Sequence, residues 1–149
     1  MTTLIHQRVD LAQKGQNPTV LCKMPSGWAV FGDMQMLNGY CLLLPDPVPP
    51  DLNALSITER EIFLRDMALI GDALLEVTGA VRINYEILGN SEKALHAHII
   101  PRYAAEPQDL GRGPVWFYDW DKAPRFDPRI HKTLMDKIRA ALEKRMRDV

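Results

Sequence analysis

The sequence predicts an α+β fold, a single domain built on one antiparallel sheet. Candidate strands occur before and after one long stretch with helical periodicity, and a late helix follows. Strands that follow one another directly favour antiparallel pairing, whereas a parallel sheet needs a crossover between successive strands. With 149 residues, 46% of them hydrophobic, the chain is long enough to bury a substantial core, and we treat residues 1–149 as one domain.

The first third of the chain contains three short strand candidates. Residues 1–17 precede them and are polar, so we expect an N-terminal arm with about one helical turn. We expect the strands at residues 19–22, 28–31 and 40–45, with a turn at residues 25–27. Residues 45–55 carry four prolines and are expected to form a connector.

A long helix follows the connector. Ser56 is expected as its N-cap, and Glu59 three residues later completes a capping box. Apolar residues then recur at helical spacing, at positions 63, 67, 70, 74 and 77. Gly79 stands where a C-cap is expected, so the helix should end there.

Two strands joined by a turn come next. Residues 81–88 alternate between two faces, and residues 89–93 are typical of a turn, so residues 94–102 should return antiparallel. Pro101 has no amide proton, so this strand should stop there or lie along an edge. The turn is expected to bring Asn84, Asn90 and Ser91 close to the returning strand.

The returning strand carries two histidines on one face. Leu95, Ala97 and Ile99 are expected to point toward the core, and His96 and His98 toward the opposite face. A rise of roughly 3.4 Å per residue places the two imidazoles about 7 Å apart along a rigid strand. This pair is the chemical feature around which the rest of the chain is organised.

The remaining third of the chain is an aromatic tail and a helix. Residues 104–127 contain Trp116, Phe117, Tyr118 and Trp120, and we expect them to pack over the sheet or against a partner subunit rather than to stack bases. Asp127 and Pro128 are a good N-cap and first helical residue. The helix has an apolar stripe at positions 130, 134, 138 and 142, and His131 beside it is expected on the surface.

Composition excludes several classes of protein. The chain has 18 basic and 19 acidic residues, so no basic excess indicates binding to extended nucleic acid. The two cysteines lack disulfide or metal spacing, which fits a reducing compartment. Residues 1–10 hold no apolar run of the length that a signal peptide or membrane span needs. We therefore expect a cytoplasmic protein with no membrane partner.

Three interpretations of the histidine pair are open on these grounds. The two residues can be polar side chains on a half-exposed strand. They can bind a metal, since histidine is the commonest metal ligand, but zinc wants three or four protein ligands and Cys22 and Cys41 are distant in sequence. They can also act chemically, because an imidazole is mostly neutral at pH 7 and can attack an electrophile such as phosphorus. We expect no metal site and no cofactor.

The segment LHAHIIPR at residues 95–102 resembles the histidine triad (HIT) superfamily. The motif of that superfamily is His-φ-His-φ-His-φ-φ, where φ is apolar, and many members continue into Pro-Arg. In this register His98 matches the third histidine and His96 the middle one, which is the nucleophile of the superfamily. Ala94 stands in place of the first histidine, which is a departure from the pattern.

The resemblance covers residues 28–103. It leaves outside the N-terminal arm at residues 1–17 and the aromatic tail with the C-terminal helix at residues 104–149. It implies an antiparallel sheet of about five strands that carries a long helix. It also implies pairing as a homodimer.

Further site residues follow from the resemblance one at a time. Residues 31–33 resemble an F-x-D element whose carboxylate binds the ribose hydroxyls, which assigns ribose binding to Asp33. Residues 39–45 resemble a Gly-His-φ-φ-φ-φ-Pro strand in which Tyr40 replaces the histidine. Asn84 matches an asparagine that contacts phosphate or orders the loop.

The turn before the histidine strand supplies two more residues. Residues 89–91 resemble the Gly-Gln-Ser/Thr that precedes the triad, with Asn90 in place of glutamine. The resemblance assigns Asn90 to phosphate binding. It assigns Ser91, five residues before the nucleophile, to hydrogen bonding with the leaving group.

The function that the resemblance implies is hydrolysis or nucleotidyl transfer on a small nucleoside phosphate. His96 would attack the α-phosphorus to form a nucleotidyl-histidine, which water would then hydrolyse. A backbone carbonyl of the motif strand would hold the proton of His96 on Nδ1, and His98 would stabilise the phosphate oxygens. The alternative is a catalytically weak or inactive regulatory protein that binds nucleotide, in which Ala94 and Asn90 mark a lost activity.

Overall fold

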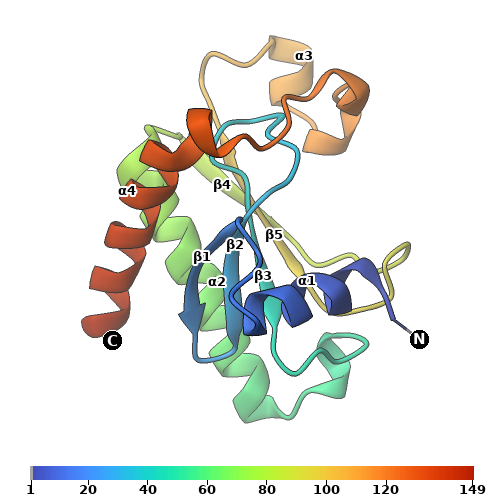
Figure 1. Ribbon diagram of the computed structural model, residues 1–149. Coiled ribbons are helices and arrows are strands. Elements are labelled where there is room, and N and C mark those ends of the chain that lie inside the picture. Colours follow the sequence, from blue (N-terminus) through green and yellow to red (C-terminus); the bar gives the residue numbers. More distant parts are fainter. Residues whose placement is uncertain (1) are drawn as a thin grey trace.

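The computed structural model describes residues 2–149 and contains a five-stranded antiparallel sheet with helices on both faces (Figure 1). Its strand order is β1-β2-β3-β5-β4. The strands are β1 (Val20–Met24), β2 (Gly27–Phe31), β3 (Cys41–Pro45), β4 (Arg82–Glu86) and β5 (Ala97–Arg102). The α-helices are α1 (Leu4–Gln13), α2 (Ile57–Thr78), α3 (Gln108–Gly111) and α4 (Pro128–Arg147), and three 3-10 helices are η1 (Leu52–Ala54), η2 (Val115–Phe117) and η3 (Trp120–Lys122). The α+β architecture predicted from the sequence is confirmed.

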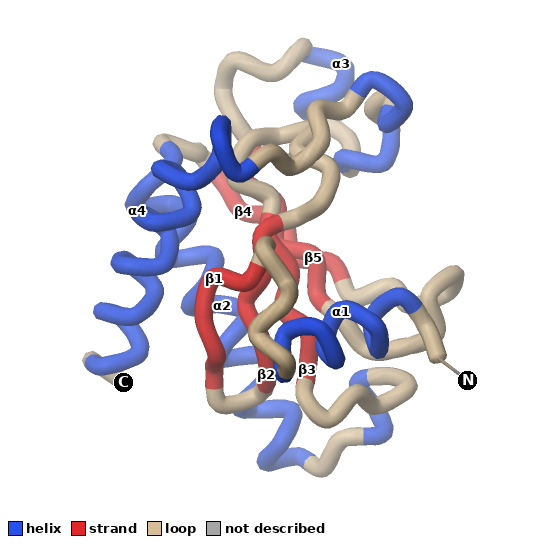
Figure 2. Tube along the Cα trace, viewed as in Figure 1, coloured by secondary structure: helices blue, strands red, loops and turns tan. Residues whose placement is uncertain are grey.

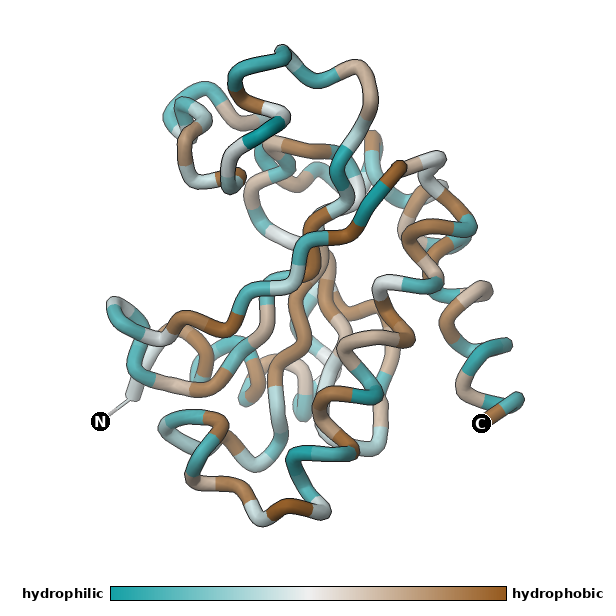
Figure 3. The backbone as a smooth tube through the Cα atoms, turned by 180° about the vertical axis from the view of Figure 1, so that it is seen from behind, coloured by the Kyte–Doolittle hydropathy of each residue, from teal (hydrophilic) through white to brown (hydrophobic). Residues whose placement is uncertain are grey.

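One face of the sheet holds the main core, which α2 and α4 cover. Leu43 of β3 and Ile99 of β5 pack there against Phe63 and Ile70 of α2 and against Ile138 of α4, and all five are fully buried. Seen from behind, the central strands carry mostly hydrophobic residues (Figure 3). Burial of this apolar area is the main source of the free energy of folding.

The long helix begins and ends where the sequence predicts. The Ser56 hydroxyl accepts from the Glu59 amide, and the Glu59 carboxylate accepts from the Ser56 amide, which completes the capping box. Gly79 adopts the left-handed conformation, with φ of 74°, that a helix C-cap favours. The connector before the helix contains only the short η1.

The opposite face of the sheet is covered by α1 and by the aromatic tail. The expectation of about one helical turn in residues 1–17 is wrong, because α1 has ten residues and packs across the strands in front of the sheet (Figure 1). Its Ile5, Val9 and Ala12 recur at helical spacing and are buried. This short stripe inside a polar stretch gives the helix its buried face.

The hairpin of β4 and β5 has the predicted register of faces. Ala97 and Ile99 point to the main core, whereas His98 pairs with Leu42 of β3 and points to the opposite face. β5 begins at Ala97 rather than at residue 94, so His96 lies just before the strand. Pro101 pairs with Ile83 of β4 at a point where β3 no longer pairs, so its missing amide proton costs no hydrogen bond on that side.

His131 differs from its predicted place on the surface. It is 6% exposed, and its ring stacks on Phe126 at a centroid distance of 5.9 Å. Its Nδ1 accepts from the Asp127 amide at 3.0 Å. The first turn of α4 places His131 toward the protein interior. The spacing of the apolar stripe did not predict this position. Among residues 2–149 no helix is both long and apolar enough to cross a bilayer.

Replacing Gly27 with alanine is expected to destabilise the sheet that carries the histidines. A Cβ at this position would lie 2.0 Å from the carbonyl oxygen of Leu44 and 2.7 Å from Cα of Pro45. Both are backbone atoms of the paired strand, so β2 and β3 would have to separate, at a cost of roughly 1–3 kcal/mol. Urea unfolding measures the loss. Gly111→Ala is the control, because the closest atom to its new Cβ would be Glu106 Cβ at 3.4 Å, an ordinary van der Waals contact; equal losses for both variants would contradict the explanation.

Candidate functional site

His96 is buried and its protonation is fixed by the backbone. The residue is 7% exposed, and its Nδ1 lies 2.7 Å from the carbonyl oxygen of Ala94. A carbonyl oxygen can only accept a hydrogen bond, so Nδ1 carries the proton. In the neutral form of the ring, Nε2 then carries a free lone pair, which is the arrangement that a nucleophile needs.

His98 lies beside His96, with ring centroids 4.9 Å apart and ring planes at 74°. Its Nδ1 is 2.6 Å from the hydroxyl of Tyr40. Burial, with a smaller contribution from the neighbouring His96, lowers the pKa of His98 to about 4. His98 is therefore uncharged at neutral pH.

A cavity of about 360 Å³ opens in front of the histidine pair. It is lined by the two histidines and by residues of the preceding turn and the tail, among them Leu88, Asn90, Ser91 and Trp116. The turn begins at Gly89, whose φ of 75° reverses the chain direction and lets the next residues face the strand. His96, His98, Asn90 and Ser91, which the sequence assigned to one site, thus line one cavity.

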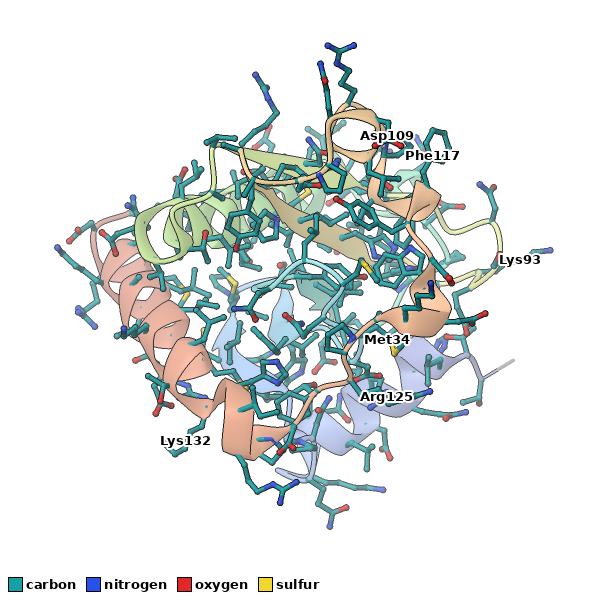
Figure 4. All side chains as sticks on the ribbon, turned by 90° about the horizontal axis from the view of Figure 1, so that it is seen from above. Met34, Lys93, Asp109, Phe117, Arg125 and Lys132 are labelled. Atoms are coloured by element: carbon teal, nitrogen blue, oxygen red, sulfur yellow. The ribbon has the colours of Figure 1, made fainter. Side chains whose placement is uncertain are left out.

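A second cavity, of about 600 Å³, also reaches His96 and Asn90. Asp51 and Leu52 of the connector border it, together with Lys93 of the turn. Lys93 extends outward at the rim of the molecule (Figure 4). His96 therefore borders open space that small molecules can enter.

The aromatic tail forms one wall of the histidine cavity. The tail lies at the upper end of the sheet in Figure 2, and Trp116 meets the edge of His98 at a centroid distance of 5.0 Å. Trp116 Nε1 donates to the carboxylate of Glu86, and the ring stacks on Trp120 at 5.3 Å. Packing over the sheet was one of two predicted placements of the tail. Its contact with the histidines was missed, although the density of aromatic residues was visible in the sequence.

Arg102 anchors this tail and engages Asn84. The Arg102 and Glu106 side chains are 7% and 4% exposed and form an ion pair with an N–O distance of 2.9 Å. Arg102 Nη1 also donates to Oδ1 of Asn84 at 2.8 Å and to the Gly113 carbonyl at 2.7 Å. Asn84 borders a different cavity from the histidines, so its geometry matches ordering of the chain rather than phosphate contact.

The tail also reaches the loop after β2. The Phe126 amide donates to the carbonyl of Asp33 at 2.8 Å, and Met34 forms a bridge with Arg125. The two bridged residues lie side by side in Figure 4, whereas Phe117 and Asp109 stand at the outer rim of the tail. The aromatic tail therefore contacts both the loop after β2 and the histidine pair.

Asp33 lies in a neighbouring pocket on the same face of the sheet. One carboxylate oxygen of Asp33, Oδ2, accepts from Arg8 of α1, a partner that the sequence did not reveal. Val30 and Leu42 line this pocket. Because Val30 pairs with Leu42 and Leu42 with His98, an apolar row runs across three strands from Asp33 toward the histidines.

The part of the chain that the structure describes contains no cluster of side chains suited to bind a metal ion. Among residues 2–149, no group of three or more His, Cys, Asp or Glu side chains is arranged to hold an ion. Cys41 is buried, and burial raises its pKa, which keeps the thiol protonated.

Comparisons with known proteins identify the fold. No protein-family model and no curated protein matches the sequence. A solved histidine triad protein from Marinobacter aquaeolei VT8 is similar in structure, with a TM-score of 0.74, 19% identity and coverage of 97% of this chain and 98% of that chain. A hypothetical histidine triad nucleotide-binding protein from Sulfolobus tokodaii also has a TM-score of 0.74, with 14% identity and coverage of 96% and 95%.

A third similar structure is a histidine triad protein from Sinorhizobium meliloti 1021, with a TM-score of 0.71, 22% identity and coverage of 87% of this chain and 93% of that chain. These likenesses extend beyond the residues 28–103 that the motif resemblance covered. At identities this low they show a shared fold.

Proposed function

We propose that this protein, which has the fold of the histidine triad proteins, is a hydrolase or transferase that acts at the α-phosphate of a small nucleoside phosphate. The observation that carries the proposal is the hydrogen bond from His96 Nδ1 to the Ala94 carbonyl. In the neutral ring this bond places the lone pair on Nε2, and His96 lines a cavity together with His98, Asn90 and Ser91. These are the groups that a covalent phosphorus chemistry without metal requires.

In the first step, His96 Nε2 attacks the α-phosphorus. A P–N bond forms as the bond from phosphorus to the leaving atom breaks, and the electron pair of that bond goes to the leaving group. Ser91 donates a hydrogen bond to the leaving atom. The ring of the nucleotidyl-histidine is cationic, and the Ala94 carbonyl stabilises its Nδ1–H. In the second step, water attacks phosphorus and releases its proton to the solvent, and the electrons of the P–N bond return to Nε2, which restores the neutral imidazole.

His98 and Asn90 bind the non-bridging oxygens of the phosphate in this proposal. Negative charge grows on these oxygens in the transition state, and fixed donors in a site that excludes water stabilise it most. His96 is buried and His98 is half-buried, so both rings are partly shielded from water. Trp116 forms the wall beside His98.

The sugar is proposed to lie toward Asp33. Arg8 contacts Oδ2 of Asp33, which leaves Oδ1 to accept from a ribose hydroxyl. Leu42, which is half-buried on β3, lies between Asp33 and His98 and offers an apolar surface to a nucleoside. A nucleotide bound along this face would place its phosphate at the histidines and its ribose at Asp33.

Ala94 is compatible with this chemistry. Its carbonyl, not its side chain, makes the hydrogen bond to His96, and its methyl group is fully buried. Ile5 and Val9 of α1 belong to the same apolar cluster. The alternative function is a regulatory protein that binds nucleotide with little or no turnover. Its support is the absence of the first imidazole of the motif at position 94.

Capture of the covalent intermediate tests the proposal. The protein is incubated with a labelled nucleoside phosphoramidate and separately with a labelled dinucleoside polyphosphate, quenched, and digested for mass spectrometry. We expect a nucleotidyl group on the peptide that contains His96, and product that accumulates with time. Binding of nucleotide with neither adduct nor product from either compound would favour the regulatory alternative.

We also propose that the protein forms a homodimer through β4 and α2. The outer edge of β1 is covered, since Arg139 donates to the Leu21 carbonyl at 2.6 Å, whereas β4 pairs only with β5. Tyr85 of β4 is 40% exposed and packs on Gly71 of α2, and Leu75 one turn later is 42% exposed. An open strand edge beside exposed apolar side chains favours association with a second copy.

Light scattering is expected to give a mass of twice the 16.9 kDa of one chain. Leu75→Arg should shift the protein toward monomer, because it places a charge in the proposed interface. Ile130→Arg, at a position of α4 that is 71% exposed, should leave the mass unchanged. A monomer at all concentrations, or equal effects of both variants, would refute this interface.

A further inference from the structure

The hydroxyl of Tyr40 has one partner, and it is His98. The two groups are 2.6 Å apart, and no other hydrogen bond to this hydroxyl occurs within residues 2–149. The two rings stack with centroids 6.0 Å apart and an interplanar angle of 17°, and Tyr40 is 7% exposed. Gly32 makes this position possible, because a Cβ there would lie 2.5 Å from the Tyr40 ring. The contact is therefore held by packing on several sides.

The direction of this hydrogen bond follows from satisfying both groups. A neutral imidazole has one N–H donor and one nitrogen that accepts. If His98 Nδ1 donated, the phenolic proton would be left without an acceptor in a buried place, which is costly. If Tyr40 donates, both groups are satisfied, and the proton of His98 must lie on Nε2.

Both groups are uncharged at neutral pH, as this direction requires. Burial raises the pKa of Tyr40, so it keeps its proton. Burial and His96 lower the pKa of His98 to about 4. Glu86 pairs with His98 across the strands and Glu92 lines the cavity, and the pKa of His98 is lowered overall with these acidic groups nearby.

We infer that Tyr40 is a positioning residue, which donates to Nδ1 of His98 and thereby fixes His98 as an uncharged Nε2–H donor. The two histidines then hold opposite tautomers. His96 carries its proton on Nδ1 and offers a lone pair, whereas His98 carries its proton on Nε2 and offers a donor. That this donor serves a phosphate oxygen rests on the proposed function, but the tautomer itself does not.

The consequence is a donor that does not depend on pH in the neutral range. A phenol cannot gain a proton there, so it donates at every pH at which His98 is uncharged. The tautomers of the two histidines are therefore fixed separately. The Ala94 carbonyl fixes that of His96, and Tyr40 fixes that of His98.

Nitrogen-15 NMR of the histidine rings in the full-length protein without ligand tests the inference directly. At pH 7 we expect Nε2 of His98 to be protonated and Nδ1 unprotonated, and the reverse for His96. Tyr40→Phe should turn the signals of His98 into those of a mixture of tautomers and leave His96 unchanged. Tyr103→Phe is the matched control, because the hydroxyl it removes bonds the Asn38 carbonyl and not a histidine; it should leave both rings unchanged.

An Nδ1-protonated or cationic His98 in the unaltered protein would overturn the inference, and this measurement needs no variant. An unchanged tautomer in folded Tyr40→Phe would overturn it as well. If the protein turns over nucleotide, Tyr40→Phe should lower kcat roughly tenfold with little change in KM, a smaller loss than the roughly 10²–10³-fold for removing a direct donor. If it turns over none, the proposed function fails while the NMR result still decides the role of Tyr40.

Discussion

Replacing His96 with asparagine is expected to lower turnover by roughly 10⁴-fold or more while nucleotide binding persists. Asparagine retains a donor for the Ala94 carbonyl but offers no basic nitrogen to attack phosphorus. The covalent route is then closed, whereas the cavity, Asp33 and His98 remain. Single-turnover kinetics measures the chemical step, and calorimetry with a nucleoside monophosphate measures binding.

Two further variants serve as references for the size of the loss of turnover in His96→Asn. His98→Asn removes a donor but keeps the nucleophile, so we expect an intermediate loss of roughly 10²–10³-fold. His6→Gln is the control, because His6 completes the capping box of α1 and glutamine commonly fills that position, so activity should not change. Turnover of His96→Asn within tenfold of the unaltered protein would rule out a covalent role for His96.

Replacing Arg102 with methionine is expected to destabilise the protein by roughly 3–5 kcal/mol. The substitution leaves the Glu106 carboxylate 4% exposed without its ion partner. It also removes donors from the carbonyls of Leu110 and Gly113, which hold the tail close to the sheet. Urea unfolding measures the free energy, and Trp116 fluorescence should report loosening of the tail at lower urea than the sheet.

The reason for this loss can be separated from simple loss of packing. A double variant with Glu106→Gln as well removes the unpaired buried charge, so part of the stability should return. Arg129→Met, in an exposed ion pair with Asp127, should leave the unfolding midpoint unchanged. Equal midpoints for the single and double variants would show that the charge of Glu106 is not the cause.

The same ion pair makes stability depend on pH. Burial raises the pKa of Glu106, but hydrogen bonds from Arg102, Tyr118 and the Tyr103 amide outweigh burial and lower it overall. A carboxyl whose pKa is lower in the folded state stabilises the fold above its unfolded pKa. That stability is lost as pH falls through the folded pKa. Arg102→Met should therefore flatten the acid side of the stability profile.

The sequence by itself determined the local structure of the histidine strand and of α2. Alternation along residues 94–102 assigned Leu95, Ala97 and Ile99 to the core and the two histidines to the other face, because a strand has a period of two residues. The capping box at Ser56 and the C-cap at Gly79 fixed both ends of α2. These signals depend on neighbours within a few residues, so they can be read from the chain.

Only the tertiary structure decided what covers the histidine face. Arg8 reaches Asp33 across 25 positions, Tyr40 reaches His98 across 58, and Trp116 reaches Glu86 across 30. Asn84 was assigned to phosphate or to ordering of the chain, and only its contact with Arg102 favours the second role. Such partners depend on how separate elements pack and on which buried polar groups still need a hydrogen bond. No local periodicity carries that information, since it arises only when the chain closes on itself.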